Sequence, residues 1–361
     1  MEAMDKKQHV YVALSGGVDS AVSAVRLLDQ GYQVMGIFME TWKDPKWEKA
    51  INDSQPPESF AANAAKAIGI PFVSLDVRDV FFHRVVRSFI KQYVRGLTPN
   101  PCLFCNPQVK WGVLQTYALE HGADFFATGH YARIVKHPDG QVQLLRGKDR
   151  TKDQSYVLAM LSQAQLRLSL LPLGELTKAE VRKQAKTLNL DVADRQDSQD
   201  LCFLGDIDYR DFLQRYAPNS ESPGEIVNLE GKVLGKHQGL AFYTIGQRRG
   251  IQVAAPEPYF VIGKDTNNNR LVIGFADQAQ KGHLRSIHPN WISGEPPTQG
   301  ELFEVMIRYR TQPIAAQLVF ISGDEFRLEL SQPLRGITPG QVAVLYQGEV
   351  CLGGGIIDSA W

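Results

Sequence analysis

The first 135 residues alternate between short apolar runs and segments with helical spacing, and no other feature constrains the fold as strongly. The apolar runs predict strands at His9–Leu14, Gln33–Met39, Phe72–Asp76 and Phe125–Thr128. The segments between them predict helices near Ala21–Asp29, Pro57–Ile68, Val80–Tyr93 and Val109–His121. Such alternation forms a parallel sheet with helices on both faces, and ligands bind at the carboxyl ends of its strands. We therefore expect an α/β fold with a doubly wound parallel sheet.

The character of the chain changes after Ala217, where short β-rich runs alternate with Gly, Pro and Asn turns. These runs predict strands at Gly224–Val227, Phe260–Gly263, Leu271–Ile273, Leu302–Ile307, Ala316–Phe320, Phe326–Leu330 and Ala343–Tyr346. Residues 156–215 are rich in helical patterns, and Thr177 with Glu180 fits an N-terminal capping box. Pro289–Gly300 has the composition of a linker. We therefore expect three domains, at residues 1–208, 209–284 and 285–361.

The charge balance argues against a protein that coats nucleic acid through bulk charge, because Lys and Arg number 39 and so do Asp and Glu. Any RNA binding must come from geometry and a few placed cations. Hydrophobic residues make up 43% of the chain, which excludes a largely disordered protein. No apolar stretch is long enough to cross a membrane, and Met1–Gln8 lacks the apolar part of a secretory signal. We expect a cytoplasmic protein.

A glycine loop, Ser15–Ser20, follows the first predicted strand and opens the first helix. Gly16 and Gly17 let backbone amides close on an anion, and the helix N-terminus adds its positive dipole end. No Lys follows the glycines, so this is not a Walker A loop, and the spacing of a dinucleotide fingerprint is absent. Asp19 is a candidate ligand for Mg²⁺ beside phosphate oxygens. The alternative is a tight turn in which Asp19 or Ser20 caps the helix.

Three of the four cysteines lie in segments that indicate chemistry. Cys102 and Cys105 form a Cys-x-x-Cys loop stiffened by two prolines, and Cys202 follows 97 residues later. Thiolates are nucleophiles, and loop amides or helix N-termini would lower their pKa. Together with a phosphate-binding loop, three thiols indicate sulfur transfer, in which one sulfur carries a persulfide and another resolves it through a disulfide. Cys351 lies in an apolar run and is expected to be a core thiol.

Two metal-binding interpretations of the same thiols remain open. Cys102, Cys105 and Cys202, with His130 as a fourth ligand, could bind structural Zn²⁺. The same three thiolates could instead hold a 4Fe-4S cluster with one open iron. Buried, inert thiols are the remaining alternative.

Two short segments combine cations with glycine or an aromatic ring. These are Arg248-Arg249, within Gly246–Gly250, and Arg308-Tyr309-Arg310. A flipped base stacks on a tyrosine ring or a guanidinium plane, so both segments are candidates for RNA contact. A solvated strand surface is the alternative for each.

These features together resemble a known family. Ser-Gly-Gly-Val-Asp-Ser after a first strand is the signature of the PP-loop ATP pyrophosphatases, and the whole chain resembles the bacterial tRNA-specific 2-thiouridylases. The matching stretches cover almost the whole chain: Ser15–Ser20, Gly36–Met39, Thr98–Asn106, Ala127–Tyr131, Lys152–Tyr156, Asp197–Phe203, Gly235–Gly250, Thr338–Gln341 and Gly348–Ile356. The resemblance implies a Rossmann-like PP-loop ATPase domain followed by two β-rich domains, the last a small six-stranded β-barrel.

The resemblance also implies the reaction and its cofactors. A sulfurtransferase of this family uses ATP and Mg²⁺ to adenylate the C2 oxygen of the wobble uridine of tRNA, and persulfide sulfur then displaces AMP. Cys202 would carry the persulfide, and Cys105 would be the catalytic nucleophile, able to form a transient disulfide with Cys202. ATP would be bound by Ala13, Leu14, Ser15, Gly16, Gly17, Val18, Asp19, Ser20, Met39 and Gly129.

The partners implied by the resemblance are tRNA and a sulfur donor. The tRNA would be held at its anticodon stem-loop, with Lys, Glu and Gln acceptors expected, and the donor would be a cysteine desulfurase or a sulfur relay protein. Asn100, Pro101 and Cys102 would meet the target base. The remaining tRNA contacts would come from His130, Lys152, Asp153, Gln154, Arg308, Tyr309 and Gln341.

One position departs from the best-known members of the family, which carry Asp where this chain has Cys102. A thiol does not replace a carboxylate as a general acid or base. Other members carry Cys-x-x-Cys, and an iron–sulfur cofactor is proposed for them. Two other functions stay open: a PP-loop ligase that amidates a small-molecule carbonyl, which would not need the cysteines, and a non-catalytic RNA-binding protein.

Overall fold

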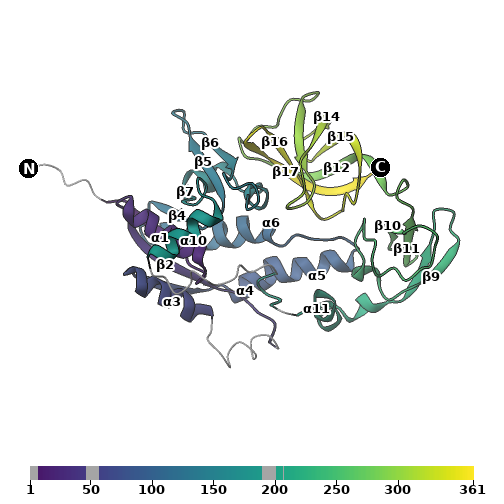
Figure 1. Ribbon diagram of the computed structural model, residues 1–361, viewed down its shortest axis with the longest axis horizontal. Coiled ribbons are helices and arrows are strands. Elements are labelled where there is room, and N and C mark those ends of the chain that lie inside the picture. The colour runs from purple at the N-terminus through teal and green to yellow at the C-terminus, as the bar shows by residue number, and fades with distance from the viewer. Residues whose placement is uncertain (1–6, 46–56, 189–200, 206) are drawn as a thin grey trace, which may run out of the picture.

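The structure is a computed structural model that describes residues 7–45, 57–188, 201–205 and 207–361. Residues 197–200 of the predicted Cys202 motif lie outside the described residues. Figure 1 shows an α/β region beside the N-terminus, a barrel that contains the C-terminus, and a smaller sheet at the far end of the longest axis. None of the helices in the described part of the chain is long and apolar enough to cross a membrane.

The N-terminal sheet has five parallel strands in the order β3-β2-β1-β4-β7. They are β1 (His9–Ala13), β2 (Gln33–Glu40), β3 (Phe72–Asp76), β4 (Phe125–Ala127) and β7 (Ser169–Leu170). Val10 and Val12 of β1 belong to the core formed with α1 (Val18–Asp29) and α3 (Pro57–Ile68), whereas Tyr11 belongs to the core on the opposite face. The expected doubly wound parallel sheet is confirmed.

The helices on that opposite face differ from the prediction, because π-helical turns interrupt them. The first consists of α4 (Arg78–Phe81), η1 (Phe82–Val86) and α5 (Arg87–Val94). The second consists of α6 (Cys102–Cys105), η2 (Asn106–Leu114) and α7 (Gln115–Glu120). An apolar period of 3.6 residues does not reveal a switch to i→i+5 hydrogen bonds, which are frequent at functional sites. The Cys-x-x-Cys segment therefore lies at the start of a helix.

An unpredicted hairpin joins the α/β region to the barrel. Its strands are β5 (Ala132–Lys136) and β6 (Val142–Arg146), and β6 pairs with the C-terminal strand β17 (Val350–Ala360) through Leu144 and Cys351. Its turn contains Pro138-Asp139-Gly140, a turn signature that the prediction from apolar runs overlooked. Three helices follow: α8 (Ser155–Leu158), α9 (Gln163–Arg167) and α10 (Lys178–Thr187). Thr177 and Glu180 form the predicted capping box of α10.

The smaller sheet has the strand order β10-β11-β8-β9 and lies at the far end of the molecule (Figure 1). Three of its strands were predicted, and β9 was not. The elements of this region are α11 (Tyr209–Tyr216), η3 (Pro218–Glu221), β8 (Gly224–Val227), β9 (Val233–His237), η4 (Leu240–Phe242), β10 (Phe260–Asp265) and β11 (Arg270–Gly274).

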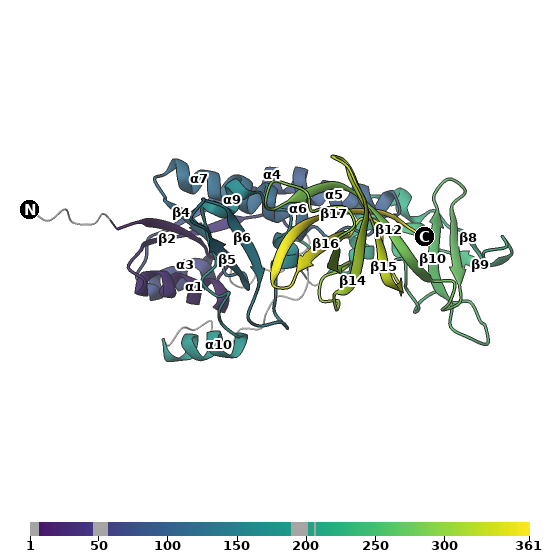
Figure 2. The ribbon, with the colours of Figure 1, turned by 90° about the horizontal axis from the view of Figure 1, so that it is seen from above.

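Six strands close into a barrel in the order β12-β15-β14-β13-β16-β17, with β12 paired to β17. They are β12 (Gln280–Trp291), β13 (Leu302–Met306), β14 (Ile314–Ile321), β15 (Glu325–Arg335), β16 (Val342–Gln347) and β17. The expected barrel is confirmed, and Figure 2 shows it from above. The predicted linker at Pro289–Gly300 is wrong in its first part, because β12 continues to Trp291. The register of β12 shifts between Ile287 and Asn290, and this irregularity accommodates Pro289.

Candidate functional site

The glycine loop connects the carboxyl end of β1 to the first turn of α1. Gly16 has a φ of +71°, and a Cβ there would lie 2.6 Å from the Cβ of Phe60 in α3, so only glycine fits. The Ser20 hydroxyl donates to the Gly17 carbonyl at 3.0 Å and accepts from the Ser15 amide at 3.2 Å. Gly17 caps α1 without a side-chain bond. The two glycines, the serine hydroxyls and the helix N-terminus, which are expected of an anion-binding turn, therefore lie together in one closed loop.

Two other segments expected at the nucleotide site border this loop. Leu14 donates its amide to the Ile37 carbonyl of β2, two residues before Met39. Gly129 follows β4, and a Cβ there would lie 3.0 Å from the Asp19 carbonyl carbon and 3.1 Å from the Ser20 nitrogen. The loops after three adjacent strands thus meet at one edge of the sheet.

Asp19 makes three side-chain bonds that the sequence did not reveal. The Lys178 ammonium lies 2.8 and 2.7 Å from its two carboxylate oxygens, and the Tyr131 hydroxyl donates to it at 2.7 Å. Tyr131 and Lys178 are both buried. Asp19 does not cap the helix, so the predicted alternative of a capping Asp19 is not found; it is instead the acceptor of a small polar cluster beside the glycine loop.

The Cys-x-x-Cys segment is held by hydrogen bonds to the two residues before it. Asn100 accepts the Cys102 amide on its side chain at 3.2 Å, and the Cys105 amide donates to the Pro101 carbonyl at 2.8 Å. Cys102 is exposed, whereas Cys105 is buried. The prolines therefore present one thiol to solvent and place the other against the core.

Cys202 is exposed and is anchored by the residue after it. The Phe203 ring is buried and packs edge-on against Phe81, Phe89 and Phe212 at centroid distances of 5.3 to 6.0 Å. The Phe203 carbonyl accepts the amide of Asp44, which follows β2. The Cys202 segment is thereby attached to the carboxyl edge of the sheet.

A buried ion pair supports this attachment. Asp44 is 0% exposed, and Arg215 of α11 donates to both of its carboxylate oxygens at 2.5 and 2.6 Å. Burying a carboxylate is costly unless it is paired, so removing Arg215 would take away the cation that pairs with Asp44 beneath the Cys202 segment. Neither residue was singled out from the sequence, because their separation of 171 positions carries no local signal.

The three thiols converge, as shown by their electrostatic interactions. Burial raises the pKa of Cys105 to about 12, and the neighbouring Cys202 and Cys102 thiols raise it further against an opposing effect of Lys110. Although Cys202 is exposed, the protein around its thiol raises its pKa to about 11 by desolvation, with Cys102 as the next cause. The pKa of Cys102 is also raised by burial. The expectation that the fold lowers these pKa values is wrong: surrounding protein favours the neutral thiols.

Lys110 is a residue beside the thiols that sequence analysis did not single out. It lies in η2, and its positive charge lowers the pKa of Cys102, Cys105 and Cys202. No described residue accepts a hydrogen bond from its ammonium. Lys110 also acts on His130, whose pKa lies well below 6.5, first because of burial and then because of this charge. His130 is therefore neutral, with its Nδ1 2.8 Å from the Thr128 hydroxyl.

The metal interpretations can be tested against this arrangement. Among the described residues, no three His, Cys, Asp or Glu side chains form a group that could hold a metal ion. The three thiols and His130, all within the described part, therefore do not fit a zinc or iron–sulfur site as they are placed, and we derive no step through either group. Cys351, as expected, is a buried thiol of the core.

The segment at residues 152–154 is tied into the protein. Asp153 accepts the amides of Gly147 and Ser155 on one carboxylate oxygen, at 2.9 and 3.0 Å. Gln154 accepts the Tyr131 amide at 2.9 Å and donates its own amide to the Tyr131 carbonyl. Lys152 is partly exposed. Gln154 thus contacts Tyr131, whose hydroxyl donates to Asp19.

The barrel residues expected to contact tRNA lie at a junction with the Cys-x-x-Cys loop. Gln341 donates to the Thr98 carbonyl at 2.7 Å, and Arg308 donates to the Ile245 carbonyl at 2.8 Å and to the Thr338 hydroxyl. The Tyr309 ring lies 6.1 Å from that of Tyr156. Gln341 and Arg308 therefore hold three regions of the chain together.

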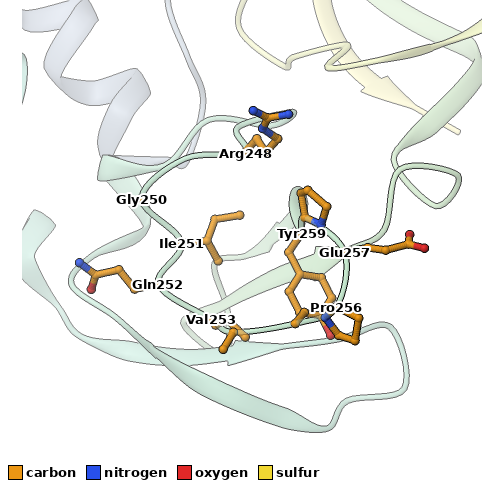
Figure 3. Close-up of a pocket in the computed structure, with 11 residues that line it drawn as sticks. Arg248, Gly250, Ile251, Gln252, Val253, Pro256, Glu257 and Tyr259 are labelled. Atoms are coloured by element: carbon orange, nitrogen blue, oxygen red, sulfur yellow. The ribbon is translucent and has the colours of Figure 1, made fainter.

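Arg248 lies at a pocket of about 350 Å³ near the smaller sheet. Figure 3 shows Ile251 and Tyr259 at its centre and Glu257 pointing away on the opposite side from Gln252. One cation and one carboxylate give this pocket a mixed lining that defines no ligand class.

The doubly wound sheet with its closed glycine loop defines a nucleotide-binding α/β protein of the PP-loop class. Residues 8–206 match the family model described as the tRNA methyl transferase HUP domain. Residues 210–275 match the tRNA methyl transferase PRC-barrel domain, and residues 281–357 match the aminomethyltransferase beta-barrel domain.

Relatives match the chain over nearly its full length. The tRNA-specific 2-thiouridylase of Carboxydothermus hydrogenoformans is 42% identical and covers 99% of both chains. That of Streptococcus sanguinis is 40% identical over 99% of this chain and 97% of its own. A solved 4-thiouridine synthetase–RNA complex with bound ATP matches at 15% identity with a TM-score of 0.33, over 59% of this chain and 51% of that one. The chain belongs to the tRNA-specific 2-thiouridylase family and is an enzyme of the sulfurtransferase class.

Proposed function

We propose that this chain thiolates the C2 position of the wobble uridine of tRNA, using ATP and a cysteine persulfide. Membership of the 2-thiouridylase family supports the substrate and the reaction class. The observation that carries the mechanism is that the Cys105 and Cys202 thiols lie within electrostatic reach of each other although 97 residues separate them. A ligase that amidates a small molecule would not require this convergence.

The first step activates the base. The C2 oxygen of uridine attacks the α-phosphorus of ATP, the bond to the bridging oxygen breaks, and pyrophosphate leaves. The amides of Gly16 and Gly17 and the N-terminus of α1 bind the phosphates, with Met39 and Gly129 beside the nucleotide. The neutral His130 offers the pyrimidine a hydrogen bond without adding charge.

The second step transfers sulfur. The terminal sulfur of the Cys202 persulfide bonds to C2, and the Cys105 thiolate attacks the Cys202 sulfur, so that the S–S bond of the persulfide breaks and AMP leaves. The transferred sulfur is reduced to a thiocarbonyl while the two cysteines are oxidised to a disulfide, which an external thiol must reduce. Exposure of Cys202 suits loading by a sulfur donor protein, and burial of Cys105 protects the resolving thiol.

One residue of this site, Asp19, has a side chain suited to bind Mg²⁺. Mg²⁺ binds through one or two carboxylates together with substrate phosphates, and the Asp19 carboxylate lies beside the phosphate-binding loop. Asp19 would hold the ion, which offsets phosphate charge when bound. The rest of the mechanism is assigned to the residues of the chain.

For tRNA, we propose that Asn100, Pro101 and Cys102 meet the target base and that Lys152 and Tyr309 contact the anticodon region. Asp153, Gln154, Arg308 and Gln341 act by placing these segments, because their polar atoms are hydrogen-bonded within the protein. We keep three domains at residues 1–208, 209–284 and 285–361 as part of the proposal.

The test is reconstitution. Purified protein is incubated with ATP, Mg²⁺, unmodified tRNA and a cysteine desulfurase with cysteine, and 2-thiouridine is measured by retardation on an organomercurial gel. We expect ATP-dependent thiolation in the wild type and in Cys351→Ala, the matched cysteine control. No thiouridine, under aerobic or anaerobic conditions, contradicts the proposal. Iron and zinc analysis of the anaerobic protein then shows whether a metal accompanies activity.

A further inference from the structure

Lys264 is a partly buried cation with which no described carboxylate pairs. It lies on β10 of the smaller sheet, and its ammonium donates to the Gly96 carbonyl at 2.8 Å, its one hydrogen bond within the described part of the chain. Desolvation, with no carboxylate among the causes, lowers the pKa of Lys264 to about 8. Burying a charge without an opposite charge is costly, so packing alone does not account for this lysine. The catalytic steps proposed above leave it unused.

The Gly96 carbonyl lies where helix α5 ends, and Figure 1 shows α5 reaching towards the smaller sheet. Gly96 has a φ of +77°, and the amides of Gly96 and Leu97 donate to carbonyls of the last helical turn at 2.9 Å, as in a Schellman motif. Residues 97–101, the connecting segment, then lead from this turn to Cys102, the first residue of α6. A lysine at a helix C-terminus binds carbonyls that the helix leaves free. Lys264 therefore fixes the point at which the chain leaves α5 for the Cys-x-x-Cys segment.

The barrel also binds the connecting segment. Residues 97–100 form neither helix nor strand, so contacts with other regions set their path. The Thr98 amide donates to the Pro339 carbonyl at 2.9 Å, and Gln341 donates to the Thr98 carbonyl at 2.7 Å. The smaller sheet and the barrel thus each hold backbone groups at the start of this segment, within a few residues of the loop proposed to meet the target base.

We propose that Lys264 is a positioning residue for thiolation, which holds the Gly96 carbonyl so that the connecting segment places the Cys-x-x-Cys segment beside the target base. This inference rests on the proposed function, which assigns base binding and sulfur transfer to that segment. The competing explanation is structural: Lys264 would only attach the smaller sheet to α5. Loss of the lysine would then lower thermal stability without changing turnover or the surroundings of Cys105, so all three are measured.

Steady-state thiolation of tRNA by the full chain compares wild type, Lys264→Met, Lys264→Arg and Lys232→Met, and thermal melting shows whether each variant is folded. Lys264→Met loses a hydrogen bond from a charged group, so kcat should fall about tenfold, while the affinity for ATP, measured by calorimetry, should stay within about twofold. Lys264→Arg keeps a charged donor and should recover part of the rate. Lys232 is exposed between β8 and β9 of the same sheet, so Lys232→Met is the matched control and should behave as wild type.

Alkylation of the cysteines, followed by mass spectrometry, shows whether the effect is local. Without tRNA and at fixed pH, the buried Cys105 should react about five- to tenfold faster in Lys264→Met, because its segment is held less tightly, while the buried Cys351 of the barrel should change by less than about twofold. The inference is overturned if the kcat of Lys264→Met stays within about twofold of wild type, or if Cys105 and Cys351 accelerate equally, which indicates general loosening. A wild type that does not thiolate tRNA contradicts the proposed function alone, since alkylation still tests the placement of Cys105.

Discussion

The glycine loop and the thiol cluster lie at the same edge of one sheet but are built in different ways. Ser20 closes the loop from five residues away, whereas Cys202 reaches its partners through Phe203 and the Asp44–Arg215 pair. The loop is closed by hydrogen bonds within a few residues, and we propose that its amides bind the phosphates of ATP. Desolvation raises the pKa of the buried Cys105 and also of the exposed Cys202, which favours the neutral thiols. The nucleotide half is therefore preorganised locally, and the sulfur half depends on distant elements.

The sharpest separation of the two halves is Cys202→Ser. This change removes the proposed persulfide carrier, so thiolation should fall to background, while ATP affinity should stay within about twofold because the loop is untouched. Organomercurial gels measure thiolation, and calorimetry measures the affinity for ATP. A parallel loss of ATP binding would show that the two halves are not independent.

Gly16→Ala changes the glycine loop instead. The left-handed backbone costs about 1–2 kcal/mol for a residue with a Cβ, and the contact with Phe60 adds to this, so ATP affinity should drop by about tenfold or more. Gly31→Ala is the matched control, since its φ is +89° and nothing lies within 4 Å of an added Cβ. Comparable ATP binding in both variants would contradict a preorganised loop.

The alkylation rate of Cys105 and Cys202 should depend on pH and on the charge of Lys110. Because burial raises the pKa of Cys105 and Cys202, alkylation of these thiols should accelerate about tenfold per pH unit from neutral to alkaline pH. Lys110→Gln removes a cation that lowers both pKa values, so alkylation at fixed pH should slow by about three- to tenfold. Mass spectrometry of alkylated peptides measures the rates. Lys91→Gln, an exposed charge change, serves as the control, and a pH-independent rate would refute the account.

The smallest expected effect concerns the barrel junction. Gln341→Ala removes one hydrogen bond to Thr98, shortly before the Cys-x-x-Cys segment, which should lower the thiolation rate about twofold. Gly348→Ala, in a barrel turn with nothing within 4 Å of an added Cβ, is a control for changes to the barrel. Steady-state thiolation assays compare Gln341→Ala with Gly348→Ala. Equal rates would show that this barrel contact does not support sulfur transfer.

These differences also explain what could be predicted from the sequence. Ser15–Ser20 is a contiguous strand-turn-helix pattern, so its fold and role followed from local chemistry. The hairpin of β5 and β6 was missed although Asp139-Gly140 marks its turn. The π-helical turns and strand β12 were missed because local periodicity does not reveal them. Lys110 and Lys178 were missed because their importance comes from which residues they approach. Convergence of the thiols was expected from the combination of three cysteines with a phosphate-binding loop and from the family resemblance, because their spacing in the sequence does not predict it.

The pairing of β6 with β17 has a consequence for dissection of the molecule. Leu144 and Leu145 are paired to the last strand of the chain, so removing the barrel would leave β6 paired with β5 alone. A strand with free amides and carbonyls on one side recruits other strands. A truncated nucleotide-binding fragment is thus expected to self-associate, and biochemical work on this enzyme requires the intact polypeptide.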